Sequence, residues 1–320
     1  MRAVWSAQHP YIVRKLHKKY GDVVRTAPGE LSFANAVAWD DIYSNRTGAN
    51  SEAFRKSEIW HGNPGGGPCS VFGTIDPKKH ARIRRLLDPA FGERATLRQE
   101  PILREYADLC VTKLRARLSK GGSTIINICD WFNFFLFDTI GDLSFGESFD
   151  CLEKCEHEPW MTQMAAAIKL HYITINLRHY PIITALLKPF SSYLLPPDLV
   201  AQHLDYLKRS TEKLSRRLAS DTNRPDIVSQ LLKSDDGRDG LTSEEIKLNC
   251  ILFINAASET TSTTLTGAVS SLLQNPASMS KLQNELRKFS TTSELTLTAL
   301  KQLPYLDGVL NEALRMCNPK

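Results

Sequence analysis

A glutamate followed by a run of threonines interrupts an apolar stretch of the chain. Glu259 and Thr260 come directly after the small residues Ala256-Ala257-Ser258, which leave room for a flat group to approach the backbone. A carboxylate in an apolar helix without a cation nearby is costly, so it indicates a partner elsewhere or a functional role. A threonine hydroxyl beside such a carboxylate can pass protons. A helix face that meets water at a crevice accounts for the same residues equally well.

A second candidate lies in a basic segment, Lys78 to Arg85, which has five cations and a histidine in eight residues. His80 and Arg84 are four residues apart, so on a helix they project from one face. The planar guanidinium of Arg84 is well shaped to bind carboxylates. Taken alone, such a run more often marks a solvated helix face or a localisation patch.

A third candidate is the pair Glu312 and Arg315, three residues apart in the stretch LPYLDGVLNEALRM. An acid and a cation at this spacing on a helix usually form a surface ion pair. By itself the pair therefore predicts a helix and little more.

The element that must position the first candidate is a long helix, predicted from about Ser243 to Gln274. Thr242 and Glu245 have the spacing of a capping box, and Asn275-Pro276 ends the helix. At 1.5 Å rise per residue it would be roughly 48 Å long. Because Cys250 to Ala257 is apolar nearly all round, the helix should run through a core, with Glu259 mid-helix and largely buried.

The other segments predict more helices and a small β portion. A type II turn at residues 27–30 joins strands at 23–26 and 30–33. Asp76-Pro77 caps and starts the helix that carries the basic segment. The remaining helices are predicted at 34–43, 100–119, 131–149, 204–219, 226–233, 276–289, 297–303 and 305–316. The fold class is therefore mainly α with a small β portion, in one domain over residues 1–320.

Composition narrows the class of protein. The chain has 40 basic and 35 acidic residues, a net charge of +5, which is too mild and dispersed to argue for nucleic acid. Its seven cysteines are odd in number and contain no CxxC pair, so we expect reduced thiols and predict no metal-ligand set. No signal peptide and no membrane span is apparent, so we expect at most peripheral membrane contact.

Taken together and in order, the three candidates resemble the motifs of the cytochrome P450 family. Residues 256–261 resemble the oxygen-binding A-G-x-[D/E]-T-[T/S] stretch, with Ala257 where Gly is usual. His80 and Arg84 resemble W-x-x-x-R, with His for Trp, and Glu312 and Arg315 resemble E-x-x-R.

The resemblance implies a role for each residue. Glu259 and Thr260 would form a catalytic proton relay, and Ala256 would lie against the heme. His80 and Arg84 would hold the heme propionates, and Glu312 and Arg315 would brace the fold. The segment from Pro159 to His203 would gate substrate entry.

The family's axial cysteine lies in an F-x-x-G-x-R-x-C-x-G loop that follows the E-x-x-R helix, and residues 1–320 contain no such loop. The resemblance therefore implies a P450 fold that is incomplete at its C-terminus, without the membrane anchor and the heme-ligand loop. It also implies that this chain alone has no monooxygenase activity and forms no heme–thiolate complex. An in-frame ligand loop beyond Lys320 in the transcript would restore the enzyme.

By resemblance, the activity would be that of filamentous-fungal monooxygenases of secondary metabolism, which insert oxygen into a small lipophilic substrate. Heme would be the cofactor, and an NADPH-cytochrome reductase the electron donor. The family works at the endoplasmic reticulum membrane, so without an anchor this chain would be cytoplasmic or peripheral. The alternatives are a non-catalytic pseudoenzyme or gene remnant, and a nucleic-acid-binding module built on the basic segment. The substrate itself is not encoded in any motif.

Overall fold

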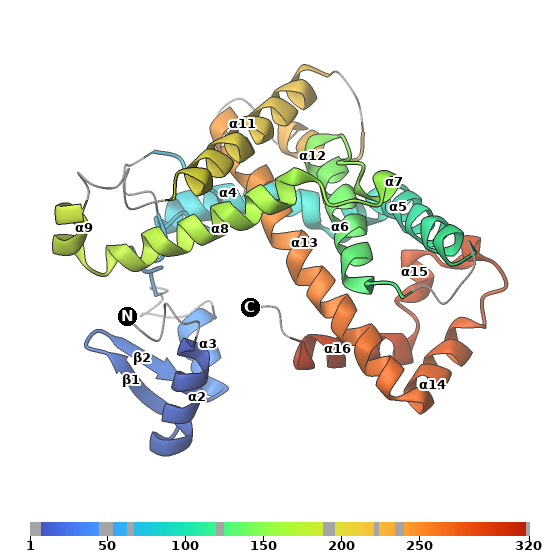
Figure 1. Cartoon of the computed structure of the whole chain (residues 1–320), viewed down its shortest axis with the longest axis horizontal. Helices are drawn as coiled ribbons and strands as arrows, with labels where there is room; N and C mark the ends of the chain where they lie inside the picture. Colours follow the sequence, from blue (N-terminus) through green and yellow to red (C-terminus); the bar gives the residue numbers. More distant parts are fainter. Residues whose placement is uncertain are drawn as a thin grey trace. The chain divides into compact units, whose positions relative to one another are not determined.

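A computed structural model describes residues 8–44, 54–62, 67–119, 125–187, 196–220, 224–233 and 240–317. The chain forms two compact units, Met1–Ser57 and Glu58–Lys320. The described elements are helices apart from one two-stranded sheet, so the predicted fold class is confirmed. Figure 1 labels these elements.

The first unit is a hairpin between two helices. Its elements are α2 (His9–Tyr20), β1 (Val23–Ala27), β2 (Glu30–Phe33) and α3 (Val37–Tyr43). The strands are antiparallel with Val23 opposite Phe33, as predicted, but the turn that joins them is not the predicted type II turn, because Gly29 lacks the positive φ that such a turn requires at its third residue. The last helix begins at Val37 rather than the predicted Ala34, because the Asn35 side chain accepts a hydrogen bond from the Val37 amide (2.7 Å) and leads the chain into the helix.

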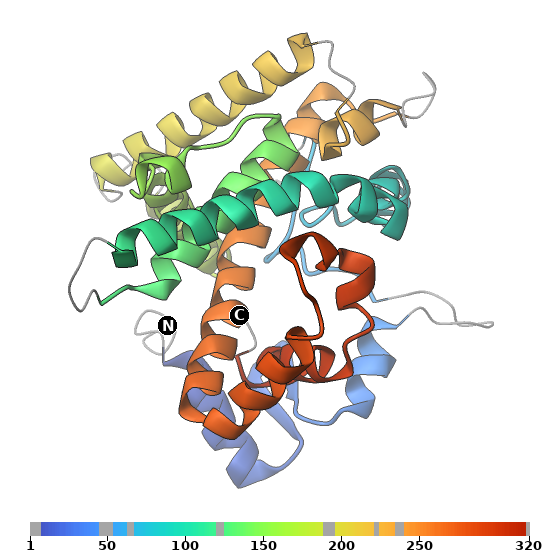
Figure 2. The same cartoon turned by 90° about the vertical axis from the view of Figure 1, so that its right-hand side faces the viewer.

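The second unit is organised around α13 (Ser243–Gln274), whose 32 residues match the predicted helix at both ends. The capping box is present, because the Thr242 hydroxyl accepts from the Glu245 amide and the Glu245 carboxylate accepts from the Thr242 amide. Figures 1 and 2 show α13 passing along α6 (Ile128–Phe145), and these two helices make the most extensive contact in the described chain.

The other helices of this unit fall before and after α13. They are α4 (Pro77–Phe91), α5 (Glu93–Ser119), α7 (Cys151–Lys154), α8 (Pro159–Arg178), α9 (Pro181–Leu187), α11 (Pro197–Ala219), α12 (Ile227–Lys233), α14 (Pro276–Leu286), η2 (Thr292–Glu294), α15 (Leu297–Leu300) and α16 (Pro304–Met316). Along the described ranges, none of the helices combines the length and the apolar character that crossing a bilayer requires.

Three helix boundaries differ from the predictions by four residues or more. Helix α5 begins at Glu93 rather than Glu100, because buried Ala95 and the bond from Gln99 Nε2 to Ala90 O (3.3 Å) hold the extra turns. Helix α6 ends at Phe145, since Gly146 adopts the left-handed conformation (φ 71°). Helix α11 starts at Pro197, seven residues early, because a proline is well suited to the first turn.

Aromatic side chains fill the core where α6, α8 and α11 meet. Trp160 is 1% exposed and lies 4.4 Å from Phe149 and 5.2 Å from Tyr206, measured between ring centroids. Phe137 and Phe145 complete the cluster. Each such pair stabilises the fold beyond the area that it buries, by about 1 kcal/mol.

Candidate functional site

The middle of α13 is buried on one side and open on the other. Ile254, Ser258 and Ser262 are buried, whereas Ala256 and Glu259 are exposed and Thr260 is half-buried. The prediction that Glu259 is largely buried is therefore wrong. It fails because the packed face of the helix follows the four-residue step from Ile254 to Ser258 and Ser262, and Glu259 is about a quarter turn away from that line.

Threonine hydroxyls in the middle of α13 bond back onto the backbone of the same helix. Thr260 Oγ1 donates to Ala256 O (2.6 Å), and Thr263 Oγ1 donates to Glu259 O (2.9 Å). Thr264 Oγ1 repeats the pattern onto Thr260 O (3.1 Å). Bonds of this kind occupy each hydroxyl proton and leave the oxygen lone pairs available to accept a proton or hydrogen bond.

The basic candidates lie on α4, whose start is capped as predicted. Asp76 Oδ1 accepts from the amides of Lys78 (2.8 Å) and Lys79 (3.0 Å). His80 is half-buried, while Arg84 is exposed and has Asp88 Oδ1 3.7 Å from its Nε atom. An exposed ion pair this long contributes little, so the Arg84 guanidinium can exchange this partner for another carboxylate at low cost.

An aromatic contact joins the two candidate faces. The rings of Phe91 on α4 and Phe253 on α13 lie 4.9 Å apart in an edge-to-face arrangement (71°). Phe91 follows Arg84 by seven residues, which is two helical turns, so the two side chains share a face of α4. Thr260 follows Phe253 by the same step on α13. Each candidate group is therefore about 10 Å along its helix from the contact.

The third pair forms as expected. Arg315 Nη2 donates to Glu312 Oε1 (2.6 Å), and Arg315 Nε donates to Glu312 Oε2 (2.7 Å). Both side chains are exposed, at 67% and 59%. The hydrogen bond from Arg315 lowers the pKa of the Glu312 carboxyl, and the same bond raises the pKa of Arg315. What this pair braces stays a prediction.

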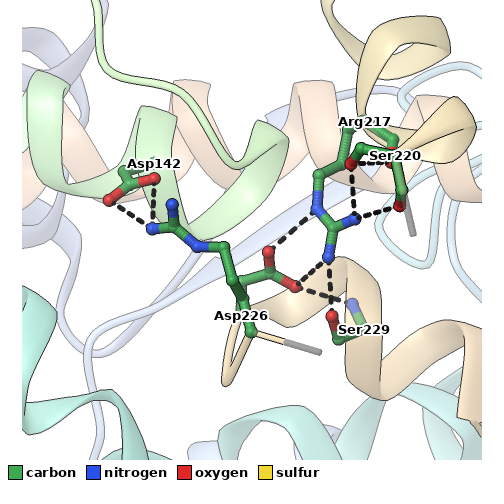
Figure 3. Close-up of polar contacts among 6 residues, drawn as sticks. Asp142, Arg217, Ser220, Asp226 and Ser229 are labelled. Atoms are coloured by element: carbon green, nitrogen blue, oxygen red, sulfur yellow. Dashed lines mark hydrogen bonds and ion pairs between the residues drawn. The ribbon is translucent and has the colours of Figure 1, made fainter. Parts of the chain in front are cut away.

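Sequence reasoning missed a buried polar network, which Figure 3 shows. Arg217 donates to both carboxylate oxygens of Asp226 (2.9 and 3.1 Å) and to the hydroxyl of Ser229 (2.6 Å). Beside it, Arg224 binds both oxygens of Asp142 on α6 (2.7 and 2.8 Å). One part of the network could have been predicted from the sequence. Asp226 has the position of an N-cap residue at the start of α12, and its Oδ1 atom accepts from the Ser229 amide three residues later (2.8 Å).

A second missed contact reaches the residue next to Ala256. The Tyr206 hydroxyl on α11 donates to Asn255 Oδ1 on α13 (2.6 Å). Burial raises the pKa of this phenol, so the hydroxyl stays protonated and its donor role is fixed. The contact ties α11 to the middle of α13.

The cysteines divide by burial. All seven are free thiols. Burial raises the pKa of Cys110 to about 11, and those of Cys151 and Cys250 to about 12, so these three are poor nucleophiles and poor metal ligands. The Cys317 thiol lies directly against Gly267, where any side chain would overlap it. In the described parts of the chain, no cluster of His, Cys, Asp and Glu is arranged to hold a metal ion.

Comparison with solved structures supports the fold, and a family model gives the class of protein. The fold is similar to that in the crystal structure of the cytochrome P450DA heme domain, with a TM-score of 0.62 and 22% identity over 77% of this chain and 51% of that one. The cytochrome P450 family model matches residues 2–319, so the chain belongs to the cytochrome P450 family. The resemblance inferred from the three motifs is confirmed.

Curated relatives at about 35% identity are fungal cytochrome P450 monooxygenases. They include lcsI of Purpureocillium lilacinum (34% identical, over 96% of this chain and 59% of the relative) and astJ of Aspergillus oryzae (36%, 96% and 60%). A third is efuB of Hormonema carpetanum (36%, 99% and 64%). The chain therefore spans about three fifths of the length of these relatives. The cofactor of the family is heme.

Proposed function

We propose that the face shared by α4 and α13 is the heme-binding face of a monooxygenase. The observation that carries this proposal is the Phe91–Phe253 contact, because Arg84 and Thr260 each lie two helical turns from it on the same face of their own helix. The residues present fit heme: Arg84 and His80 supply donors for propionate groups, and exposed Ala256 lets a flat ring approach the backbone. Heme, when bound, supplies the activation of dioxygen.

The protein groups would then deliver protons and orient the substrate. Glu259 is exposed, so its carboxylate can take up a proton from water. Thr260 is the next residue along the helix, and its oxygen keeps lone pairs directed away from the Ala256 carbonyl. The pair can therefore pass protons from solvent to the open side of α13, while Glu312 and Arg315 support the fold.

The substrate class, the electron donor and the metabolic context are assigned by similarity to the family and its relatives. We assign a small lipophilic substrate, electrons from an NADPH-cytochrome reductase, and a place in fungal secondary metabolism. By family, the protein would work at the endoplasmic reticulum membrane surface, either cytoplasmic or peripherally bound.

The proposal is tested by titrating the purified chain with hemin and following the Soret absorbance. Arg84→Ala should weaken hemin binding severalfold, because it removes the strongest propionate donor. Lys78→Ala is the matched control, since it removes a cation from another face of the same helix. Equal effects of the two substitutions, or none from either, would refute the clamp.

The relay is tested in a hybrid in which the C-terminal part of a 36% identical relative follows residue 320. Thr260→Ala should raise the peroxide formed per NADPH consumed, because the hydroxyl that passes protons is lost. Unaltered coupling would leave Thr260 as an ordinary packing residue.

The second candidate is a non-catalytic protein. A thiolate ligand is what favours O–O cleavage in this family, so a protein that supplies none would be non-catalytic. On this reading, the reduced, heme-supplemented chain gives no thiolate-type Soret band in a carbon monoxide difference spectrum. The appearance of that band would favour the enzyme.

A further inference from the structure

The interface between α8 and α11, called the seam below, changes along its length from aromatic to basic side chains. At one end it is aromatic, with Trp160 on α8 against Tyr206 on α11. The buried stripe of α8 continues in steps of three and four residues from Trp160 through Met164 and Ala167, and it includes Ile175 near the end of the helix. Exposed His171 and half-buried Arg178 lie on the same side of α8, so basic side chains border the apolar stripe at its C-terminal end.

The stripe of α11 shows the same change. Tyr206, Ser210 and Leu214 are buried on the face toward the core, and His203 precedes them by one turn on that face. The Nδ1 atom of His203 is buried and has no hydrogen-bond partner within the ranges that the structure describes. A buried polar atom in this state indicates a missing partner such as a ligand or water.

A third element joins the basic end of the seam. Arg178 Nη1 donates to the backbone oxygens of Ile59 (3.2 Å) and His61 (3.4 Å). These bonds hold residues 58–62 against the end of α8. They also leave the other nitrogen atoms of the Arg178 guanidinium without a partner among the described residues.

The charged groups around His171 are all basic. They are Arg178 on its own helix, His203 on α11 and His61 in the adjoining segment, and together with burial they lower the pKa of His171. Burial also lowers the pKa of His203. The sequence of α9, PIITALL, contributes no titratable side chain, and Glu58 is exposed and is not among the groups that act on His171. An anion placed here would therefore meet the Arg178 guanidinium at any pH, and the imidazolium groups of His171 and His203 only below their lowered pKa values.

Exposed apolar side chains lie next to this cluster. Trp60 is 42% exposed and packs edge-on against His179 (5.8 Å between ring centroids). Phe72 is 55% exposed and packs against His61 (4.9 Å). Tyr172, adjacent to His171, is 47% exposed. Exposed aromatic side chains in a group mark a binding surface more often than a chance exposure.

We infer that His61, His171, Arg178 and His203 form a binding site for the carboxylate of a lipophilic acid, whose apolar body lies against the neighbouring aromatic side chains. This assignment rests on the proposed function where it names the substrate class, a lipophilic acid rather than a neutral compound. The binding site itself requires neither heme nor turnover.

Binding is measured by isothermal titration of the chain with decanoate and with decanol. Decanoate should bind at least tenfold more tightly, because only the carboxylate engages the basic groups. Arg178→Gln and His171→Gln should each weaken decanoate binding severalfold and leave decanol binding unchanged. Lys169→Gln is the matched control, since it removes a cation from the opposite, exposed side of α8 and should change neither affinity.

The pH dependence is measured with decanesulfonate, which stays charged throughout. A bound anion favours the protonated imidazoles, so affinity should rise severalfold from pH 8 to pH 6, and His171→Gln should flatten that rise. Equal binding of decanol and decanoate, an equal loss in Lys169→Gln, or no pH dependence would overturn the inference.

Two features of the design separate this test from an effect on folding and from the test of the heme face. Arg178→Gln also removes the bonds to residues 59 and 61, which risks misfolding, but His171→Gln leaves those bonds in place and therefore decides the test. Loss of decanoate binding with intact hemin binding refutes only this inference. Loss of hemin binding with intact decanoate binding refutes only the proposed heme face.

Discussion

Two arginine–carboxylate pairs in this protein have almost the same geometry and opposite surroundings. Arg217 and Asp226 are 4% and 0% exposed, whereas Arg315 and Glu312 are 67% and 59% exposed. In both, the guanidinium binds both carboxylate oxygens. Only the exposed pair belongs to a recognisable motif, so the pair that a sequence pattern reveals is not the pair on which the described fold depends.

The environment explains this difference. A buried pair has lost its hydration, so each partner depends on the other, and removing one leaves a charge without compensation. An exposed pair is screened by water and each partner can be rehydrated. The buried pair is further fixed by Gly146, because a side chain there would come within 2.5 Å of Arg217 Cδ.

The largest expected effect follows from breaking the buried pair. Arg217→Met should lower the free energy of unfolding by about 3–5 kcal/mol, because Asp226 is left buried without a cation. Urea unfolding followed by circular dichroism measures this loss. The double variant Arg217→Met, Asp226→Leu should be more stable than Arg217→Met alone. A double variant at least as unstable as the single one would show that unpaired charge is not the cause.

A smaller effect is expected where a buried carboxylate has amides rather than a cation as partners. Asp138 on α6 is 1% exposed and accepts from the amides of Phe149 (3.1 Å), Cys151 (3.0 Å) and Leu152 (2.8 Å). Asp138→Ala should cost about 3 kcal/mol, since three buried donors lose their acceptor. Asp138→Asn keeps one acceptor oxygen and should cost less. Equal losses in the two variants would rule out this account.

The sequence predicts what is set locally, and the α13 boundaries illustrate this. Thr242, Glu245 and Pro276 act within a few residues of the helix ends, so their spacing fixes both ends without knowledge of the fold. The start of α5 was missed because its first turns depend on contacts with distant residues. Glu93 binds Lys301 (2.7 Å) and Glu100 accepts from the Leu297 amide (2.8 Å).

Motif spacing can select candidate residues but cannot predict their environment. It selected His80, Arg84 and Thr260, whose roles stay predictions, but the burial of Glu259 depends on which face of α13 packs against α6. Similarly, Arg217 lies in a polar stretch, LSRRLAS, that is typical of a solvated helix end. Only the position of α12, which Asp226 directly precedes, brings the Asp226 carboxylate to Arg217.

Glu147 is intermediate between the buried and the exposed pair, and its contribution to stability should depend on pH. Glu147 is 38% exposed and bridges Lys213 (3.0 Å) and Arg216 (2.6 Å). Burial raises the pKa of its carboxyl, but the hydrogen bonds from Arg216 and Lys213 outweigh burial and lower it overall. A lowered folded-state pKa stabilises the protein above the unfolded value near 4.5 and is lost as the pH falls through the folded value.

The Glu147→Gln variant tests this expectation. Its unfolding free energy should lie below that of the unsubstituted chain at pH 7, and the two should converge below about pH 4. Denaturant unfolding at a series of pH values measures the difference. A gap between the two proteins that is constant with pH would mean that Glu147 acts by packing and not by its charge.

The smallest effect is expected at the motif pair itself. Glu312→Gln removes a charge whose partner is open to water, so Arg315 is rehydrated at little cost and the unfolding transition of this chain should not move measurably. The same urea titration as for Arg217→Met measures it, with Glu294→Gln, another exposed acid, as the control. If Glu312→Gln destabilises the chain as Arg217→Met does, then exposure does not decide the contribution of an ion pair here. If the unfolding transition does not move, the stability of residues 1–320 does not explain why this pair occurs in the family motif. A contact between the pair and a further segment of the family fold would then be the physical explanation.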